Sequence, residues 1–218
     1  MPSAPTVSSR IRTLADLQNR LGSVPLDRMR FHPFPGTATV PDVLTIYQQE
    51  GKLCELVEGV LVEKAVEYLQ SALAVFLLEV LNAFVRSRNL GIVTGEAGTV
   101  ELMAGLVRIP DVAFTGWDRL PGRRYPMAPV PRLVPHLAVE VLSPSNTPSE
   151  MTVKRQDYFT AGVQLVWEID PAARTIAVYT GTNQMVTLTA GDTLHGGSVL
   201  PDFALPVQDL FGELDRHN

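Results

Sequence analysis

The chain has 218 residues, of which 45% are hydrophobic and 19% charged, and its formal net charge is −5. This length fits one large domain, or one domain with an extension. Proteins that coat duplex DNA are usually basic, so any binding of nucleic acid must depend on local positive charge. The single cysteine, Cys54, excludes an intrachain disulfide and fits a cytoplasmic protein, which is the location we expect.

The N-terminal part differs from the rest, and we expect residues 1–37 to be an extension and residues 38–218 to form the domain. The opening sequence MPSAPTVSSRIRTL lacks the apolar segment of a secretory signal. The longest unbroken apolar run, ALAVFLL, is too short to cross a membrane, so we expect no membrane association. Within the extension, TLADLQNRLG is amphipathic, whereas FHPFPGT is rich in proline and glycine and predicts irregular structure.

The first half of the domain predicts a helix, a hairpin and a second, longer helix. TVPDVLTIYQQEG has the N-cap residue Thr39 and the terminating residue Gly51 of a helix. CELVEGVLVEK predicts two short strands about a turn at Glu58 and Gly59. From Val66 to Arg88, apolar residues recur at spacings of three and four, which is typical of a helix that packs on a core.

The second half predicts strands with one helix between them. GIVTG, TVELM, LVRIPDVAF and HLAVEVL have strand patterns, and a helix is expected from about Pro148 to Ala161. Thr147 and Glu150 predict a capping box at the start of this helix. VQLVWEID and TIAVYT predict a hairpin, MVTLT a further strand, and LPDFALPVQDLFGEL a loop with a short helix. This order indicates an α/β or α+β domain.

Glu140 lies inside the apolar segment HLAVEVL. If this segment is a strand, Glu140 shares one face with His136 and Ala138, while Leu137 and Val139 point to the other. An ionised carboxylate in such a strand is costly unless it is compensated. A structural ion pair, an edge strand that faces water, and a ligand to a metal ion are the three explanations.

Two further acids lie in similar positions. Asp111 begins the apolar part of RIPDVAF, and Glu55 lies in LCELVEG. Carboxylate oxygens are the ligands that Mg²⁺ and Mn²⁺ prefer, whereas the four histidines and Cys54 lack the spacing of a zinc site. We therefore predict a Mg²⁺ (or Mn²⁺) site formed by Glu55, Asp111 and Glu140.

Lys154 and Tyr158 are four residues apart in the predicted helix and so lie on the same helical face. A solvated surface lysine is the simple interpretation. A catalytic lysine would lie beside the nucleophilic water or a scissile phosphate and stabilise negative charge there.

The segment from Gly116 to Leu133 is locally basic, because it has four arginines and one aspartate. Arg119, Arg123 and Arg124 could hold phosphates, and Trp117 and Tyr125 could stack on bases. The segment joins the strands of Asp111 and Glu140, so we expect it near the acids. A solvated, flexible loop, with the aromatic residues fixing it to the domain, is the alternative.

From about Thr39 to Phe211 the chain resembles a bacterial family of putative restriction endonucleases within the PD-(D/E)XK nuclease superfamily. The resemblance depends on an ordered set of motifs: ELVEGVLVE, RIPDVAF, VEVLSPSN, Lys154 with Tyr158, and AGVQLVWEIDP. It implies an α/β restriction-endonuclease-like core, with a mixed central sheet flanked by helices and Mg²⁺-dependent hydrolysis of DNA. Asp111 and Glu140 would bind the metal, Glu55 would complete the acidic cluster, Lys154 would supply positive charge, and Tyr158 would assist at the substrate.

The chain also departs from the family pattern. Leu142 occupies the position, two residues after the second acid, at which the superfamily usually has a lysine. The predicted long helix begins EYLQSALAVF, without the early histidine of many relatives. A non-catalytic binding protein on the same scaffold is therefore the main alternative. A glycosidase using two acids is less consistent with 7% aromatic residues. A homodimer is expected for a nuclease that cuts duplex DNA, with the hairpin of VQLVWEID and TIAVYT as a candidate edge.

Overall fold

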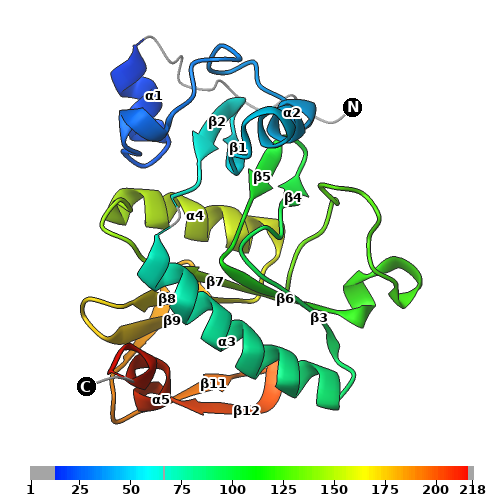
Figure 1. Ribbon diagram of the computed structural model, residues 1–218, viewed down its shortest axis with the longest axis vertical. Coiled ribbons are helices and arrows are strands. Elements are labelled where there is room, and N and C mark those ends of the chain that lie inside the picture. The colour runs from blue at the N-terminus through cyan, green and yellow to red at the C-terminus, as the bar shows by residue number, and fades with distance from the viewer. Residues whose placement is uncertain (1–12, 66, 216–218) are drawn as a thin grey trace.

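A six-stranded sheet and a four-stranded sheet form the framework of the computed structural model, which describes residues 13–65 and 67–215 (Figure 1). We expect no secretory signal in residues 1–14, and most of these lie outside the described residues. The six-stranded sheet has the order β10-β9-β8-β7-β6-β3. Its strands are β3 (Gly91–Thr94), β6 (Val112–Gly116), β7 (Leu137–Val141), β8 (Leu165–Asp170), β9 (Thr175–Gly181) and β10 (Gln184–Leu188).

The six-stranded sheet is mixed, as predicted. Only β7 and β8 are parallel, and α4 (Pro148–Ala161) connects them; the other neighbouring pairs are antiparallel. The predicted hairpin of β8 and β9 is confirmed. It does not supply a sheet edge, because β8 pairs with β7 and β9 pairs with β10. The edges of this sheet are therefore β10 and β3.

The four-stranded sheet has the order β2-β1-β5-β4, and α2 (Val40–Glu50) packs beside it. Its strands are β1 (Cys54–Val57), β2 (Val60–Glu63), β4 (Val100–Met103) and β5 (Leu106–Arg108). The expected single strand LVRIPDVAF is divided, since β5 belongs to this sheet and β6 to the other. Pro110 lies at the crossing and has no N–H for a ladder hydrogen bond, which explains the break.

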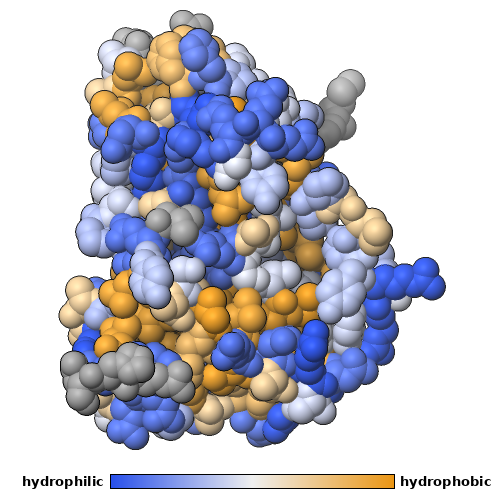
Figure 2. All heavy atoms as spheres, viewed as in Figure 1, coloured by the Kyte–Doolittle hydropathy of each residue, from blue (hydrophilic) through white to orange (hydrophobic). Residues whose placement is uncertain are grey.

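The helix α3 (Tyr68–Ser87) covers one face of the six-stranded sheet, with Leu73, Leu77, Leu81 and Val85 in the core. Val66, the expected first residue, is outside the described part. By length and composition α3 is the one described helix that could cross a membrane, a property that core helices share. Figure 2 shows hydrophobic residues over α3 and hydrophilic residues between α3 and the four-stranded sheet.

The opposite face of the six-stranded sheet packs against α4 and the N-terminal segment. Here α1 (Leu14–Arg20) contributes to a core that includes Leu17, Leu21 and Tyr158, and the short helix η1 (Leu26–Arg28) follows it. The predicted capping box of α4 is only half formed. The N–H of Glu150 donates to Thr147, but the Glu150 carboxylate binds the Arg28 guanidinium at 2.9 and 3.0 Å instead of returning to the cap.

The C-terminal part packs beside α3. The expected loop LPDFALP is a strand, β12 (Leu200–Pro206), which pairs with β11 (Thr193–Gly196) before α5 (Val207–Gly212) and η4 (Glu213–Asp215). Phe203 and Leu205 are buried in the main core, where Trp167 stacks on Phe203. Burial of these apolar side chains outweighs the proline-flanked sequence that predicted a loop.

Candidate active site

Asp111 and Glu140 come together at one end of the antiparallel pair β6–β7. Val112 lies opposite Val139 in the ladder, so Asp111, just before β6, comes next to the end of β7. The Asp111 N–H donates to the Val139 carbonyl at 2.9 Å, and the Val141 N–H donates to Asp111 Oδ2 at 2.6 Å. The backbone of β7 therefore fixes the Asp111 carboxylate beside Glu140.

Glu140 points to the face of the sheet that α4 covers. Its Oε2 lies 3.2 Å from Lys154 Nζ, and its Oε1 accepts a hydrogen bond of 2.5 Å from the Tyr158 hydroxyl. Lys154 and Tyr158 share a helical face, as predicted, and point inward. Tyr158 is fully buried, so it orients Glu140 and does not offer the exposed contact with substrate that we expected.

Glu55 reaches the same lysine from the four-stranded sheet. Its Oε1 lies 3.2 Å from Lys154 Nζ and accepts the Ile109 N–H at 3.2 Å. Its Oε2 lies 2.7 Å from an Arg108 nitrogen, and Arg108 also forms an ion pair with Asp157 of α4. Lys154 thus joins one acid from each sheet, and Glu55 is held by Lys154 and Arg108.

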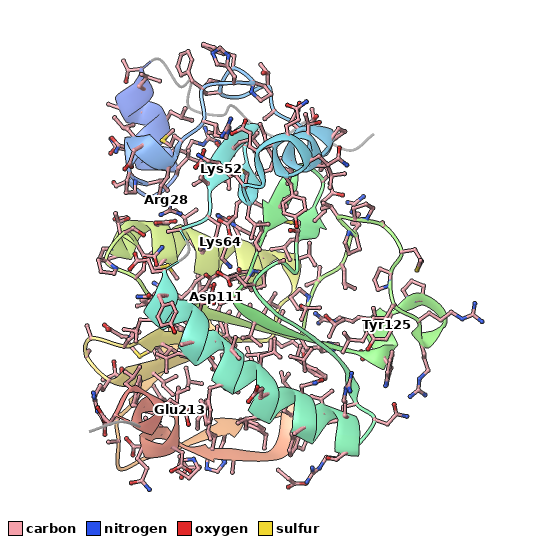
Figure 3. The ribbon with its side chains drawn as sticks, viewed as in Figure 1. Arg28, Lys52, Lys64, Asp111, Tyr125 and Glu213 are labelled. Atoms are coloured by element: carbon pink, nitrogen blue, oxygen red, sulfur yellow. The ribbon has the colours of Figure 1, made fainter. Side chains whose placement is uncertain are left out.

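Lys64 is a further member of the site that sequence reasoning missed. It follows β2, and its Nζ lies 2.8 Å from Asp111 Oδ1 and 2.6 Å from the Ile109 carbonyl oxygen (Figure 3). Arg108 was missed as well. Both are ordinary cations at the ends of short apolar strands, and the only signal for them was the presence of unpaired interior acids on the neighbouring segments.

Burial and the close charges shift the pKa values in this cluster. Burial raises the pKa of Glu140 to about 7, with Lys154 opposing and repulsion from Asp111 adding to the effect. Burial alone would also raise the pKa of Glu55, but Lys154 and Arg108 outweigh it and lower that pKa to about 2. Burial alone would lower the pKa of Lys154, but Glu140 and Glu55 outweigh it and raise that pKa. Glu140 is therefore the acid of the pair that gains a proton first.

The cluster is largely closed to solvent. Glu55, Glu140 and Lys154 are 2%, 5% and 3% exposed. Among the described residues, no group of three or more His, Cys, Asp or Glu side chains is arranged to hold a metal ion. The three acids approach one another, but Glu55 is engaged by Arg108 and Lys154 instead of joining a three-carboxylate cage. Asp111 and Glu140 are the pair on adjacent strands.

The basic segment lies at the opposite end of β6 and β7, which contradicts our expectation that it would lie near the acids. Because the two strands are antiparallel, the segment leaves β6 at Gly116 and returns to β7 at Leu137. Five residues of β6 span about 16 Å at the usual rise of about 3.3 Å per residue. Figure 3 accordingly shows Tyr125 far from Asp111.

One charged and one aromatic side chain of this segment fix it to the domain. The Arg119 guanidinium donates to the carbonyls of Val134, Pro135 and Gly162. The Trp117 indole N–H donates to Asn89. Arg123, Arg124 and Tyr125 are exposed, so these are the residues that remain able to contact a ligand.

The comparisons with known proteins first define the class of fold. A crystal structure of a putative nuclease belonging to DUF820 from Anabaena variabilis ATCC 29413 is similar to this chain, with a TM-score of 0.67 and 22% sequence identity. The similarity covers 75% of this chain and 92% of that chain. The fold is therefore that of this nuclease, an α/β fold with a mixed sheet.

The family follows from the sequence itself. Residues 40–208 match the model of the Uma2 family, which is described as "Putative restriction endonuclease". This match spans more than half of the chain, so the protein belongs to this family, and the resemblance carried by its motifs is confirmed. No curated protein matches the chain.

Proposed function

We propose that this protein is a divalent-metal-dependent DNA endonuclease. The observation that carries the proposal is the meeting of Asp111 and Glu140 at one end of β6–β7, with Lys154 in contact with Glu140. Membership of a family described as putative restriction endonucleases supports phosphodiester bonds of DNA as the substrate. The single cysteine is consistent with a cytoplasmic location, which we propose as well.

The chemistry of the oxygen atoms around Asp111 fits Mg²⁺ or Mn²⁺. Asp111 Oδ1 and the Ile109 carbonyl oxygen already hold one cation, the Lys64 ammonium. Magnesium sites often use one or two carboxylates and complete the coordination with water, so Asp111 and Glu140 suffice. When bound, the ion would lower the pKa of a water molecule and neutralise charge on the phosphate.

The remaining residues of the cluster act on charge and orientation. Tyr158 donates to one oxygen of Glu140, and Lys154 contacts the other, so the carboxylate has a fixed orientation. Arg108 holds Glu55, and Glu55 in turn contacts Lys154 from the four-stranded sheet. The Lys154 ammonium supplies positive charge where negative charge develops on the phosphate. Arg123 and Arg124 would contact the DNA backbone beyond the cleavage point.

The test is cleavage of supercoiled plasmid and circular single-stranded DNA with Mg²⁺ or Mn²⁺. Asp111→Asn and Glu140→Gln should each reduce metal-dependent cleavage by about 10²–10³-fold while the protein stays folded. Glu168→Gln is the matched control, because Glu168 lies opposite Glu140 in the parallel ladder and is buried with its own cation, Arg155. Calorimetry with Mn²⁺ should show binding that Glu140→Gln weakens and Glu168→Gln leaves in place.

The burial of the cluster favours a second candidate function, a non-catalytic binding protein on the same scaffold. Glu55, Glu140 and Lys154 satisfy one another without any other ion. This function predicts a folded wild type that shows neither Mn²⁺ binding nor cleavage. The two-acid glycosidase receives no support, because Glu55 and Glu140 contact the same ammonium. A homodimer stays a proposal, with β10 in place of the β8–β9 hairpin as the sheet edge.

A further inference from the structure

The side chain of Lys64 contacts the carboxylate oxygen of Asp111 that accepts no hydrogen bond from the backbone. Asp111 Oδ2 accepts the Val141 N–H at 2.6 Å, and Oδ1 lies 2.8 Å from Lys64 Nζ. The Lys64 side chain is 5% exposed and the Asp111 side chain 14%. Both oxygens of the carboxylate therefore have a partner within the chain, and a metal ion at Oδ1 would meet the ammonium there.

The surroundings of the Lys64 ammonium resemble the oxygen environment of a hard cation. It contacts a carboxylate oxygen and the Ile109 carbonyl oxygen at 2.8 and 2.6 Å. Backbone carbonyls and carboxylates are the ligands that Mg²⁺ and Ca²⁺ take from proteins. Lysine is a compact point charge on a flexible four-carbon stem, so it can leave such a position without a change in the backbone.

We propose that Lys64 is an internal cation that competes with the divalent ion for Asp111 and is displaced when the ion binds. This inference depends on the proposed metal-dependent function. Lys64 would keep the Asp111 carboxylate oriented in the protein without metal. After displacement the Lys64 ammonium stays near Asp111, because its side chain limits how far it can move. From there it can face a phosphate. Lys64 is thus a positioning residue that sets the affinity for metal.

Repulsion between cations at Asp111 Oδ1 favours replacement of the ammonium over simple addition of the divalent ion. The cluster has four acids, which share three cations because Arg108 pairs with both Glu55 and Asp157, whereas Lys64 alone pairs with Asp111. Adding a divalent ion beside Lys64 would place like charges in contact on one carboxylate oxygen. Like charges that share a desolvated site repel strongly, so the ion and the ammonium exclude each other at Oδ1.

Calorimetric titration with MnCl₂ tests the competition. Lys64→Met and Lys64→Gln should bind Mn²⁺ at least ten-fold more tightly than wild type, and Lys64→Arg, which retains the charge, should not. Lys52→Met is the matched control, because Lys52 is an exposed lysine paired with Glu63, next to Lys64, and it should stay within about two-fold of wild type. A merely structural lysine would give weaker binding when removed. Equal or weaker binding in both neutral variants overturns the inference.

A second readout follows the displaced side chain in the wild type. Lys64 should be protected from an amine-reactive label without metal and become labelled with Mg²⁺, as measured by mass spectrometry of the digested protein. Lys154, which is 3% exposed and contacts Glu140 and Glu55, is the internal control and should stay protected. If Lys64 stays protected from the label at saturating Mg²⁺, the proposed displacement of its side chain is wrong.

The outcomes separate this inference from the proposed function. Tight Mn²⁺ binding by Lys64→Met with no cleavage by any variant would support the competition and reject the nuclease. Cleavage by wild type with no gain in affinity in Lys64→Met and Lys64→Gln would retain the nuclease and reject the competition. Circular dichroism and thermal unfolding of each variant establish that it is folded before it is compared.

Discussion

The two ends of the β6–β7 pair use the same two strands for opposite purposes. At the Asp111–Glu140 end, Glu140 is buried and Asp111 half-buried, and each is paired with a lysine. At the other end, Arg123, Arg124 and Tyr125 are exposed, and Arg119 binds backbone carbonyls. The two strands fix where the side chains at each end lie, but whether those side chains are buried depends on what packs around each end. The acid end has a fixed geometry suited to chemistry, and the basic end has surface suited to contact.

Removing the shared lysine should have the largest effect. Lys154→Met leaves Glu55 and Glu140 buried without their common partner. Breaking a buried pair by removing one partner typically costs about 3–5 kcal/mol of unfolding free energy. Arg124→Ala at the other end should change stability by less than about 0.5 kcal/mol. Urea denaturation measures both, and similar values for the two variants would remove the distinction between the ends.

The next largest effect concerns cleavage. Glu140→Gln keeps the shape of the side chain and removes its negative charge, and we expect cleavage to fall by about 10²–10³-fold, as when one stabilising group is removed from an active site. Initial rates on plasmid at saturating Mg²⁺ provide the measurement. A loss of less than ten-fold, with Glu168→Gln unaffected, would show that the acid end does not perform the chemistry.

At the basic end we expect a change in binding with little change in turnover. The double variant Arg123→Ala and Arg124→Ala should raise KM for DNA several-fold and leave kcat nearly unchanged. If each arginine contacts one phosphate, the slope of log affinity against log salt should fall by about 2 in total. Binding measured by fluorescence anisotropy at several salt concentrations decides this. An unchanged slope would mean that the segment is only structural.

The smallest effect is a pH dependence at His136, which also lies at the basic end. Burial lowers the pKa of His136 below its usual 6.5, and the charge of Arg119 lowers it further. The unfolded chain therefore binds the proton more readily, so stability is complete above pH 6.5 and decreases as the pH falls below it. His136→Asn, which has no group that titrates in this range, should remove this slope between pH 5 and 7. Denaturation at several pH values tests it, and a slope retained in the variant would assign it to another group.

Much of the fold could be predicted from local patterns. The caps at Thr39 and Gly51 and the turn at Glu58 fixed the ends of α2, β1 and β2, because capping and turn chemistry are local. The break at Pro110 and the pairing of β12 with β11 could not be predicted. Both depend on contacts between distant segments. In RIPDVAF, the proline is the only residue that indicates a break, and it does not show that the two parts join different sheets.

The acids of the candidate site could be predicted from the sequence, but two of its cations could not. An acid inside an apolar strand is unusual enough to be noticed, so Asp111, Glu140 and Glu55 could be singled out. Lys64 and Arg108 are common residues whose importance depends on where the second sheet places them. The position of the basic segment was inferred wrongly, because connection along the chain was taken for closeness, whereas antiparallel pairing puts a connecting loop at the far end.

The passage of the chain from β5 to β6 through Pro110 has a consequence for assembly. Glu55 belongs to the four-stranded sheet and Lys64 directly follows its strand β2, Glu140 belongs to the six-stranded sheet, and Asp111 lies in the segment between the sheets. The Glu55–Arg108 pair lies within the four-stranded sheet, but Lys154 of α4 joins Glu55 of that sheet to Glu140 of the other. The cluster is therefore complete only when both sheets are packed together.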